Sequence, residues 1–474
     1  MQLTDKLTED YGPCPAVGLW QAHPSERRGP GSGAGHLRPA RAGLTRHTAH
    51  DVEAAVEEDV RVTAASPFMT LPPTCPERFR VIPESPPVKG PLTMRRRSLL
   101  TAAGAAALAV PTLGAVPAMA STATGSAARH CLPIRAMDIS SLPKNEDHGA
   151  VYRRADGRLG DPVRILAEAG ITHARLKVWV NPADGYNDKK HILSLARRLK
   201  RAGIGIWIDF HYSDSWADPA HQTKPAAWAD LDVAGLTRAV YDHTADVLGA
   251  LRRQGTPADL VQIGNELNGG MLWPTGNWDH WENLAAFLKA GLRAAHDTTP
   301  RVRTILHLAN GGDNGLYRWW FDNAVSYGVD FDVIGLSYYP FWHGSPDRAA
   351  ANMADITARY GKPCVIAETA YPFSLSSEDE TNDIMNSPSQ LTEGYPATPE
   401  GQAAWLRTVA DLAAAVPDGK GLGYCYWEGV WTYRSGSGWN PEDPTSGNAW
   451  ENLALFDFDD KALPGLRTLG HYRS

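Results

Sequence analysis

One pattern recurs eight times beyond residue 130 and restricts the fold more than any other feature. Each repeat is a short apolar, β-branched run that ends in polar or aromatic residues, followed by a loop and an amphipathic helical segment. The runs are residues 134–140, 172–180, 204–211, 260–265, 303–308, 333–338, 365–368 and 422–427. Eight strand–helix units imply a parallel sheet with right-handed crossovers, and they predict an α/β fold: a single (β/α)8 TIM barrel.

The helical segments carry the residues that favour helix ends. Asp161 and Pro162 suit the N-cap and first positions of one helix, and Gly170 follows its end. Asp232 begins a longer helix that ends before Gly255. A doubly wound open sheet is the competing fold, but no GxGxxG motif follows a strand to support it.

The first 120 residues divide into two parts. Residues 1–93 have no sustained hydrophobic period, which predicts an unstructured or wrongly assigned upstream segment. Residues 94–120 combine a basic MRRR start, an Ala-rich apolar run and a closing AMA, which predicts a secretory signal peptide, loosely of the twin-arginine kind. Since such a signal works at an amino terminus, we expect translation to start at Met94. The mature domain, 121–474, is then secreted and extracellular, with no membrane anchor.

Polar and aromatic residues follow the predicted strands, at the end of a barrel where active sites lie. They are Asp138, Asn181, Asp209, His211, Asn265, Glu266, His307, Asn310, Tyr338, Tyr339, Glu368, Trp427 and Glu428. Carboxylates gathered with amides and aromatic rings predict glycoside hydrolysis, which needs two acids beside the scissile bond. The 16 Trp and 16 Tyr residues also suit a sugar ligand. Spacing alone leaves the catalytic pair open among Asp138, Asp209, Glu266, Glu368 and Glu428.

Several motifs resemble one known family. They include RLKVW at 175–179, DFHYSD at 209–214, GNE at 264–266, NGGMLWP at 268–274 and ETAYP at 368–372. These blocks, in this order over roughly residues 133–472, are similar to the arabinogalactan endo-β-1,4-galactanases of glycoside hydrolase family 53. The chain departs from the family pattern at Ala136 and Met137, where Gly-Ala usually precedes the aspartate.

The resemblance implies a TIM barrel, retention of configuration and endo-hydrolysis of the β-1,4-galactan of pectin and type I arabinogalactan. By motif, Glu266 is the acid/base and Glu368 the nucleophile. Asn265 then hydrogen-bonds the sugar 2-OH, and Arg175 lies beneath Glu368 and keeps it ionised. The expected substrate-binding residues are Asp138, Arg175, Asp209, His211, Asn265, Tyr338, Tyr339 and Trp427. Either Tyr338 or Tyr339 is expected to donate to Glu368, and Trp427 to form a sugar platform.

No cofactor is expected. The histidines lack zinc spacing. The acidic stretch 378–383 after the seventh strand lacks the pattern of a calcium loop, so we expect a solvated loop there, with a structural calcium as the less favoured alternative. Cys364 and Cys425 are expected to be buried thiols at the inward parity of their strands, with Cys131 leaving an odd mature count. The formal charge of −7 is spread along the chain, which argues against a nucleic-acid partner, and we expect a monomer.

Two alternatives remain open at this point. One is a retaining barrel hydrolase that acts on mannan, glucan or arabinan, because the catalytic pair determines the reaction and not the sugar. The other is a carbohydrate-binding protein that has lost catalysis. The presence of Glu266, Glu368 and Asn265 argues against the second alternative.

Overall fold

The computed structural model describes residues 132–472. The predictions for residues 1–93, for the signal peptide at 94–120, for the start at Met94 and for Cys131 lie outside the described residues. Within the described part, the predicted (β/α)8 TIM barrel is confirmed.

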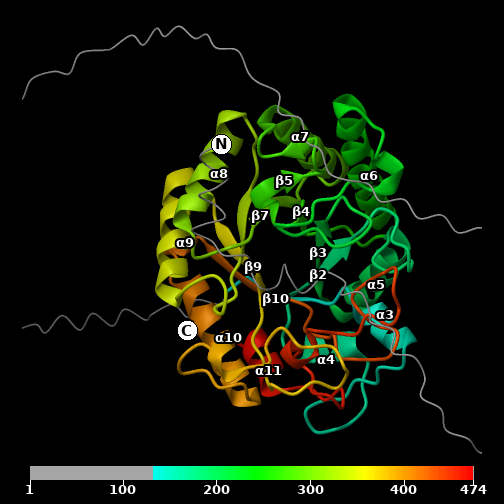
Figure 1. Ribbon diagram of the computed structural model, residues 1–474, viewed down its shortest axis with the longest axis vertical. Helices are drawn as coiled ribbons and strands as arrows, with labels where there is room; N and C mark the ends of the chain where they lie inside the picture. Colours follow the sequence, from blue (N-terminus) through cyan, green and yellow to red (C-terminus); the bar gives the residue numbers. More distant parts are fainter. Residues whose placement is uncertain (1–131, 473–474) are drawn as a thin grey trace, which may run out of the picture. The chain divides into compact units, whose positions relative to one another are not determined.

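Eight parallel strands form a closed barrel in the order β1-β10-β9-β8-β7-β4-β3-β2 (Figure 1). They are β1 (Ile134–Asp138), β2 (His173–Val178), β3 (Gly205–Phe210), β4 (Leu260–Ile263), β7 (Arg303–Leu308), β8 (Val333–Ser337), β9 (Cys364–Thr369) and β10 (Gly421–Tyr426). Each strand begins and ends within two residues of its predicted run. The strands β5 (Gly270–Met271) and β6 (Gly276–Asn277) form a small antiparallel pair in the loop after β4, which the sequence patterns did not predict.

Helices surround the barrel. They are α4 (Pro162–Glu168), α5 (Lys189–Ala202), α6 (Val233–Arg253), α7 (Trp281–Thr298), α8 (Asn314–Ser326), α9 (Pro346–Tyr360), α10 (Pro399–Ala414) and α11 (Pro464–Gly470), with a short α3 (Leu142–Asp147) after β1. The predicted caps of two helices are confirmed: Asp161 accepts a hydrogen bond from the Arg164 N–H, and Asp232 accepts one from the Gly235 N–H. Among residues 132–472, no helix is both long and apolar enough to cross a bilayer.

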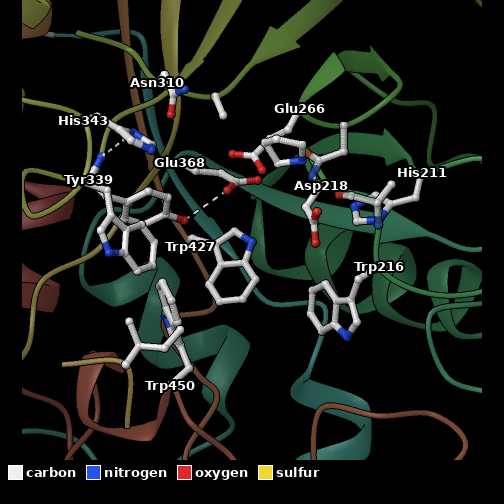
Figure 2. Close-up of a pocket in the computed structure, with 16 residues that line it drawn as sticks. His211, Trp216, Asp218, Glu266, Asn310, Tyr339, His343, Glu368, Trp427 and Trp450 are labelled. Carbon is white, nitrogen blue, oxygen red and sulfur yellow. Dashed lines mark hydrogen bonds between the residues drawn. The ribbon is translucent and has the colours of Figure 1, made fainter. Parts of the chain in front are cut away.

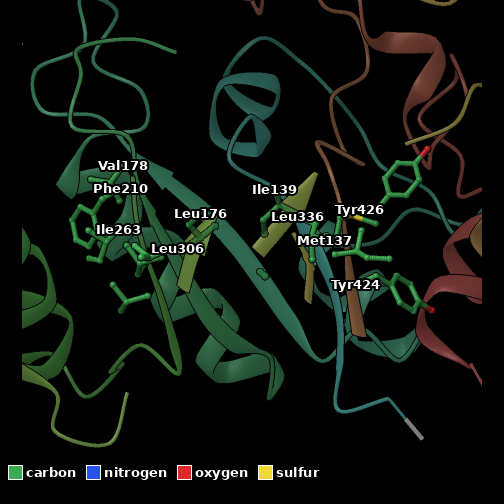
Figure 3. Packing of buried hydrophobic residues seen from close by; sticks show 14 of the residues in the cluster. Met137, Ile139, Leu176, Val178, Phe210, Ile263, Leu306, Leu336, Tyr424 and Tyr426 are labelled. Carbon is green, nitrogen blue, oxygen red and sulfur yellow. The ribbon is translucent and has the colours of Figure 1, made fainter. Parts of the chain in front are cut away.

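Alternating strand residues divide the buried side chains into two cores. Side chains such as Trp207, Ile305 and Val333 fill the barrel interior below the site. Their neighbours along the strands, such as Leu306 and Leu336, point outward and pack beneath the helices (Figure 3). The interior core closes one end of the barrel, so the polar strand ends line a crater at the other end and not a pore.

The alternation fails on β9, and this failure corrects one prediction. Val365 and Ala367 lie in the interior core, whereas Cys364 packs in the outer core, so its predicted inward parity is wrong. The pairing of β8 with β9 shifts register between Leu336 and Ser337, and this irregularity brings Glu368 into the crater although Ala367 before it also faces inward. Cys425 does face the interior, and both cysteines are buried free thiols, as expected.

Candidate active site

A cavity of about 870 Å³, counting the space open to solvent, lies at the carboxyl ends of the strands (Figure 2). It is lined by His211, Trp216, Ala217, Asp218, Pro219, Asn265, Glu266, Ala309, Asn310, Tyr339, Trp342, His343, Glu368, Ile384, Trp427 and Trp450. Six of the ten predicted site residues are in this set: His211, Asn265, Glu266, Tyr339, Glu368 and Trp427. The four others lie beneath or outside the crater.

The backbone after β4 turns sharply and presents Asn265 and Glu266 to the crater. Gly264 has φ +79°, and a Cβ at this position would lie 2.5 Å from the Leu267 side chain, so the turn favours glycine. Glu266 itself adopts the left-handed region, with φ +45°. A carboxylate residue in this region is uncommon, and such backbone strain is concentrated at functional sites.

The carboxylates of Glu266 and Glu368 meet at one hydroxyl group. Ser337 Oγ lies 2.6 Å from Glu266 Oε1 and 3.3 Å from Glu368 Oε2. These two distances place the two carboxylate oxygens within about 6 Å of each other. In retaining glycosidases the two carboxyl groups are about 5–5.5 Å apart, and in inverting glycosidases about 6.5–9.5 Å apart. The upper limit found here fits the retaining class better. The predicted convergence of the two acids is therefore present in the structure.

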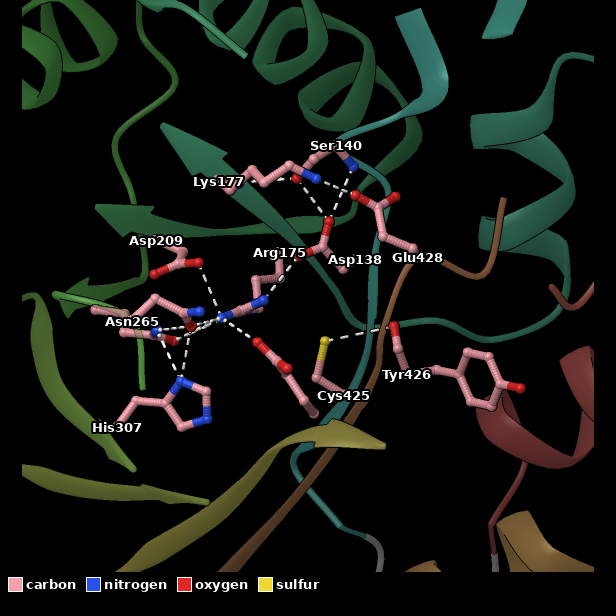
Figure 4. A network of polar contacts seen from close by, with 12 residues as sticks. Asp138, Ser140, Arg175, Lys177, Asp209, Asn265, His307, Cys425, Tyr426 and Glu428 are labelled. Carbon is pink, nitrogen blue, oxygen red and sulfur yellow. Dashed lines mark hydrogen bonds and ion pairs between the residues drawn. The ribbon is translucent and has the colours of Figure 1, made fainter. Parts of the chain in front are cut away.

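Arg175 is the cation beneath this pair (Figure 4). Its Nη2 lies 2.9 Å from Glu368 Oε1 and 2.9 Å from Asp209 Oδ2, and its Nη1 donates to Asp138 Oδ2 at 2.9 Å. The Arg175 side chain is only 1% exposed. A guanidinium in contact with three carboxylates offsets their buried charge, and its fork of donors fixes their positions.

Burial and mutual repulsion shift the pKa of both acids upward. Burial, then the charge of Glu368, raises the pKa of Glu266 well above its ordinary value. Burial also raises the pKa of Glu368, but Arg175 acts most strongly against this rise because it touches that carboxylate. The two environments therefore separate the pKa values of the two acids, and Glu266 keeps its proton to higher pH than Glu368 does.

Of the two neighbouring tyrosines, Tyr339 is the partner of Glu368. The Tyr339 hydroxyl donates to Glu368 Oε2 at 3.0 Å. Tyr338 points the other way, packs against Trp405 and donates to the Gly344 carbonyl at 2.9 Å. The expectation that Tyr338 binds substrate is corrected, because Ser337 faces inward and strand alternation turns the next residue outward.

Asp138, Asp209 and Arg175 do not reach the cavity, which corrects their assignment as direct substrate contacts. Both aspartates are fully buried, and each holds one side of the Arg175 guanidinium. His211 does line the crater. Its Nδ1 accepts hydrogen bonds from the backbone N–H of Ala217 and from Trp179, and its Nε2 therefore donates to Asp209 at 3.0 Å.

Tryptophans form one wall of the crater. Trp427, as predicted, lies at the cavity, and its ring is packed edge-on against Trp450 at 4.5 Å between centroids. Trp216 lies 5.7 Å from Trp427 on the other side. Trp450 and Asp218 also line the cavity, but strand periodicity does not predict them, because both lie in long loops and not at strand ends.

Glu428, one of the five candidate acids, is excluded from the catalytic pair by its contacts. It forms a buried ion pair with Lys177 and accepts hydrogen bonds from the backbone and hydroxyl of Ser141. The Lys177 ammonium also lies 4.0 Å from the centroid of the Trp216 ring. This ion pair supports the tryptophan wall from behind by a cation–π contact.

In the loop after β9, acidic side chains come together, and the charges of Asp379 and Glu451 act on Asp383. Asp379 accepts hydrogen bonds from the backbone of Thr381 and Asn448, and the carboxylate oxygens of Asp383 are buried with no hydrogen-bond partner. Glu378, Glu380 and Asn382 are exposed, as a solvated loop predicts, whereas Asp383 is buried. Across residues 132–472, no set of three or more His, Cys, Asp or Glu side chains is arranged to hold a metal ion.

Comparison with known proteins gives consistent matches. The model of glycosyl hydrolase family 53 matches residues 134–469. The arabinogalactan endo-β-1,4-galactanase of Thermothelomyces thermophilus is 36% identical over 337 residues, which cover 69% of this chain and 99% of that protein. The family 53 catalytic domain of Ignisphaera aggregans has a TM-score of 0.68 at 37% identity and covers 71% of this chain and 95% of its own. A fungal β-1,4-galactanase structure has a TM-score of 0.63 at 33% identity, with 72% and 100% coverage.

Proposed function

The chain belongs to glycosyl hydrolase family 53, and from this premise we propose that it is a retaining endo-β-1,4-galactanase. The observation that carries the proposal is the meeting of Glu266 and Glu368 at Ser337, with a buried guanidinium under Glu368 only. This arrangement gives one carboxyl group that keeps a proton and one that ionises, which double displacement requires.

In the first step, a Glu368 carboxylate oxygen attacks the anomeric carbon and forms a glycosyl ester. Glu266 gives its proton to the glycosidic oxygen as the bond to the leaving sugar breaks. In the second step, Glu266 takes a proton from water, the water oxygen attacks the anomeric carbon, and Glu368 leaves as a carboxylate. The configuration is inverted twice and is therefore retained.

Asn265 and Trp427 are the proposed substrate contacts in this mechanism. Asn265 Nδ2 donates one hydrogen to the Ala217 carbonyl and has a second hydrogen for the sugar 2-OH. Trp427 offers a ring for the apolar face of a sugar. His211, also at the cavity, is the third proposed contact, and it meets the sugar through its ring because both of its nitrogens are held by protein groups.

The substrate class comes from the relatives, whose printed names describe arabinogalactan endo-β-1,4-galactanases. The open crater admits an internal stretch of polymer, which suits endo-cleavage of pectic galactan or type I arabinogalactan. The proposal includes secretion after removal of residues 94–120 and action as a monomer without a cofactor. Dialysis against EDTA is accordingly expected to leave activity unchanged.

The test is incubation of the protein with potato galactan, mannan, carboxymethyl-cellulose and arabinan. Galacto-oligosaccharides of several lengths, released early and from galactan alone, would support the proposal. Shortening of mannan, glucan or arabinan would favour another retaining hydrolase. Binding to galactan with no release of reducing ends would indicate a non-catalytic carbohydrate-binding protein.

A further inference from the structure

Four buried polar groups form a line from the sugar-binding amide to the acid. His307 Nδ1 lies 2.9 Å from Asn265 Oδ1, and His307 Nε2 lies 2.9 Å from Ser337 Oγ. Ser337 Oγ lies 2.6 Å from Glu266 Oε1. The register of β7 and β8 sets His307 beside Gly335, where a Cβ would lie 3.2 Å from the His307 Cβ. A glycine on β8 therefore leaves room for the imidazole inside the barrel.

The direction of the first hydrogen bond follows from the Asn265 amide. Asn265 Nδ2 donates to the Ala217 carbonyl at 2.7 Å, so the oxygen of this amide must be the atom that faces His307. That oxygen also accepts from Arg175 at 2.8 Å and from Gln262 at 3.0 Å. Gln262 Nε2 lies 3.0 Å from His307 Nδ1 as well, but its two hydrogens have acceptors in the Gly264 carbonyl at 3.2 Å and Asn265 Oδ1 at 3.0 Å. Asn265 Oδ1 carries no hydrogen, so the imidazole nitrogen 2.9 Å from it supplies one, since two lone pairs would repel each other. His307 Nδ1 is therefore protonated.

The second direction follows from the charge of the ring. Burial, then the charge of Arg175, lowers the pKa of His307 well below its ordinary value, so the ring is neutral. A neutral imidazole with a hydrogen on Nδ1 has only a lone pair on Nε2. The contact between Nε2 and Ser337 is then a hydrogen bond that the serine hydroxyl donates.

The third direction follows because a serine hydroxyl has one hydrogen. With that hydrogen directed to His307, Ser337 presents lone pairs to Glu266 at 2.6 Å, a distance that requires a hydrogen between the two oxygens. The Glu266 carboxyl must supply it. The 3.3 Å contact to Glu368 is the longest that Ser337 Oγ makes with these three partners, and Glu368 Oε2 has Tyr339 as its own donor at 3.0 Å.

We propose that His307 and Ser337 are positioning residues that direct this chain of hydrogen bonds and hold Glu266 in its protonated form before the first step. The inference rests on the proposed role of Glu266 as the acid. By fixing the serine hydroxyl, His307 prevents it from donating to the Glu266 carboxylate, which would favour the ionised form. The His307 ring also contacts Asn265. One imidazole therefore helps to position both the amide proposed to bind the sugar 2-OH and the acid that protonates the leaving oxygen.

Other charged and titratable groups also face the two residues. Glu368, Arg175 and Asp218 act on Glu266 from β9, from β2 and from the loop after β3, and Tyr339 lies beside it after β8. Arg175, His211 and His343 act on His307. Because these groups shift the same titrations, the test compares variants that leave all of them in place.

The direct test is ¹⁵N NMR of the full chain with labelled histidine and no substrate, from pH 5 to 8. The resonances missing from the His307→Leu spectrum identify His307. The expected result is a neutral ring with its hydrogen on Nδ1, which is the minor tautomer of free histidine in water. A hydrogen on Nε2, or a ring that becomes charged in this range, would overturn the proposal. This readout does not depend on any enzymatic activity, so its failure is distinct from failure of the proposed function.

The second test is the pH profile of kcat/KM on galactan. In His307→Leu the serine hydroxyl becomes free to donate to ionised Glu266, so the high-pH limb should move to lower pH by roughly 0.5–1 unit. On a Ser337→Ala background, the same substitution should add no shift. His243→Leu removes another buried histidine, packed between Phe210 and Trp228 outside the crater, and should leave the limb in place. A high-pH limb in His307→Leu that stays or rises would contradict the proposal.

Discussion

Two groups of buried carboxylates lie in the loops and strand ends above the barrel, and they differ in what surrounds them. In the crater, Asp138, Asp209 and Glu368 share the Arg175 guanidinium. In the loops after β9 and β10, Asp383 and Glu451 lie close enough to repel, and neither forms an ion pair with a Lys or Arg side chain of residues 132–472. Both oxygens of Asp383, and Oε2 of Glu451, are buried without a hydrogen-bond partner.

The difference shows two ways in which a protein keeps buried acids. A buried carboxylate in contact with a guanidinium can stay ionised, which a nucleophile needs. A buried carboxylate without a Lys or Arg partner keeps its proton to higher pH instead: burial and neighbouring acids raise the pKa of Asp383 to about 8 and that of Glu451 to about 7. The crater therefore stabilises ionised carboxylates, whereas the loop pair, Asp383 and Glu451, stabilises the fold chiefly while both acids are neutral.

The largest expected effect comes from removing either crater acid. Glu266→Ala and Glu368→Ala should each lower kcat on galactan by at least about 10³-fold, because each removes a group that acts on the reacting atoms. Added azide distinguishes their roles by the anomer of the glycosyl azide formed. Azide should yield the α-azide in Glu368→Ala, by attack from the vacated side, and the β-azide in Glu266→Ala.

The matched control is Glu451→Gln, which removes a buried acid from the loop pair. Its kcat should stay within about threefold of the wild-type value, because Glu451 contacts Ser377 and the Glu378 backbone and not the crater. Near-full activity in either crater variant would contradict the assigned roles.

Removing the crater cation should have the next largest effect. In Arg175→Met three buried carboxylates lose their partner, and the free energy of unfolding should fall by about 3–5 kcal/mol, as measured in urea. Arg175→Lys keeps one positive charge but not the fork of donors, so it should lose less stability than Arg175→Met. Equal stability of Arg175→Met and wild type would mean that the crater acids are neutral, like the loop pair.

The sequence predicts the barrel well because its signal is redundant. Eight apolar runs and the helix caps each support the same topology, so an error of two residues at one strand end leaves the fold unchanged. The same redundancy locates Asn265 and Glu266, which follow β4 in a motif whose glycine permits the turn. Much of the site can therefore be predicted from which residues follow the strands.

The orientation of the other site residues depends on features that strand periodicity does not encode. Alternation counted back from Glu368 predicts an inward Cys364, but alternation along β9 fails at a register shift and Cys364 faces outward. Asp138 and Asp209 lie beneath the crater and hold Arg175, and a strand-end position does not distinguish a side chain beneath the crater from one that lines it. On β8, by contrast, continued alternation from Val333 to Ser337 was available and would have chosen Tyr339 over Tyr338. Trp450 lies in a loop with no period at all.

The loop pair should make stability depend on pH. Because the folded-state pKa values of Asp383 and Glu451 lie above their ordinary values near 4, their stabilising contribution is full at low pH and is lost as pH rises toward 8. Asp383→Asn removes one of these titrations, so its Tm should fall less than that of wild type between pH 5 and 8.5, by roughly 2–5 °C. Asp459→Asn, at an exposed position, should follow wild type. Equal falls in Asp383→Asn and wild type would show that Asp383 is ionised in the folded loop.

The smallest effect should come from replacing Tyr339. Its hydroxyl donates a hydrogen bond to Glu368, whereas neither oxygen of Asp383 has a hydrogen-bond donor. Its hydroxyl stabilises the carboxylate, so Tyr339→Phe should raise the pKa of Glu368 and move the low-pH limb of kcat/KM to higher pH. The loss in kcat/KM should be about tenfold, because Arg175 still holds the other oxygen. Tyr338→Phe removes the same atom from the neighbouring residue, whose hydroxyl contacts only the Gly344 carbonyl among its recorded partners, and should leave the limb unchanged. A shift of the limb in Tyr338→Phe but not in Tyr339→Phe would reverse the assignment of the two tyrosines. It would also contradict the conclusion that donors on both sides, Arg175 and Tyr339, keep Glu368 ionised.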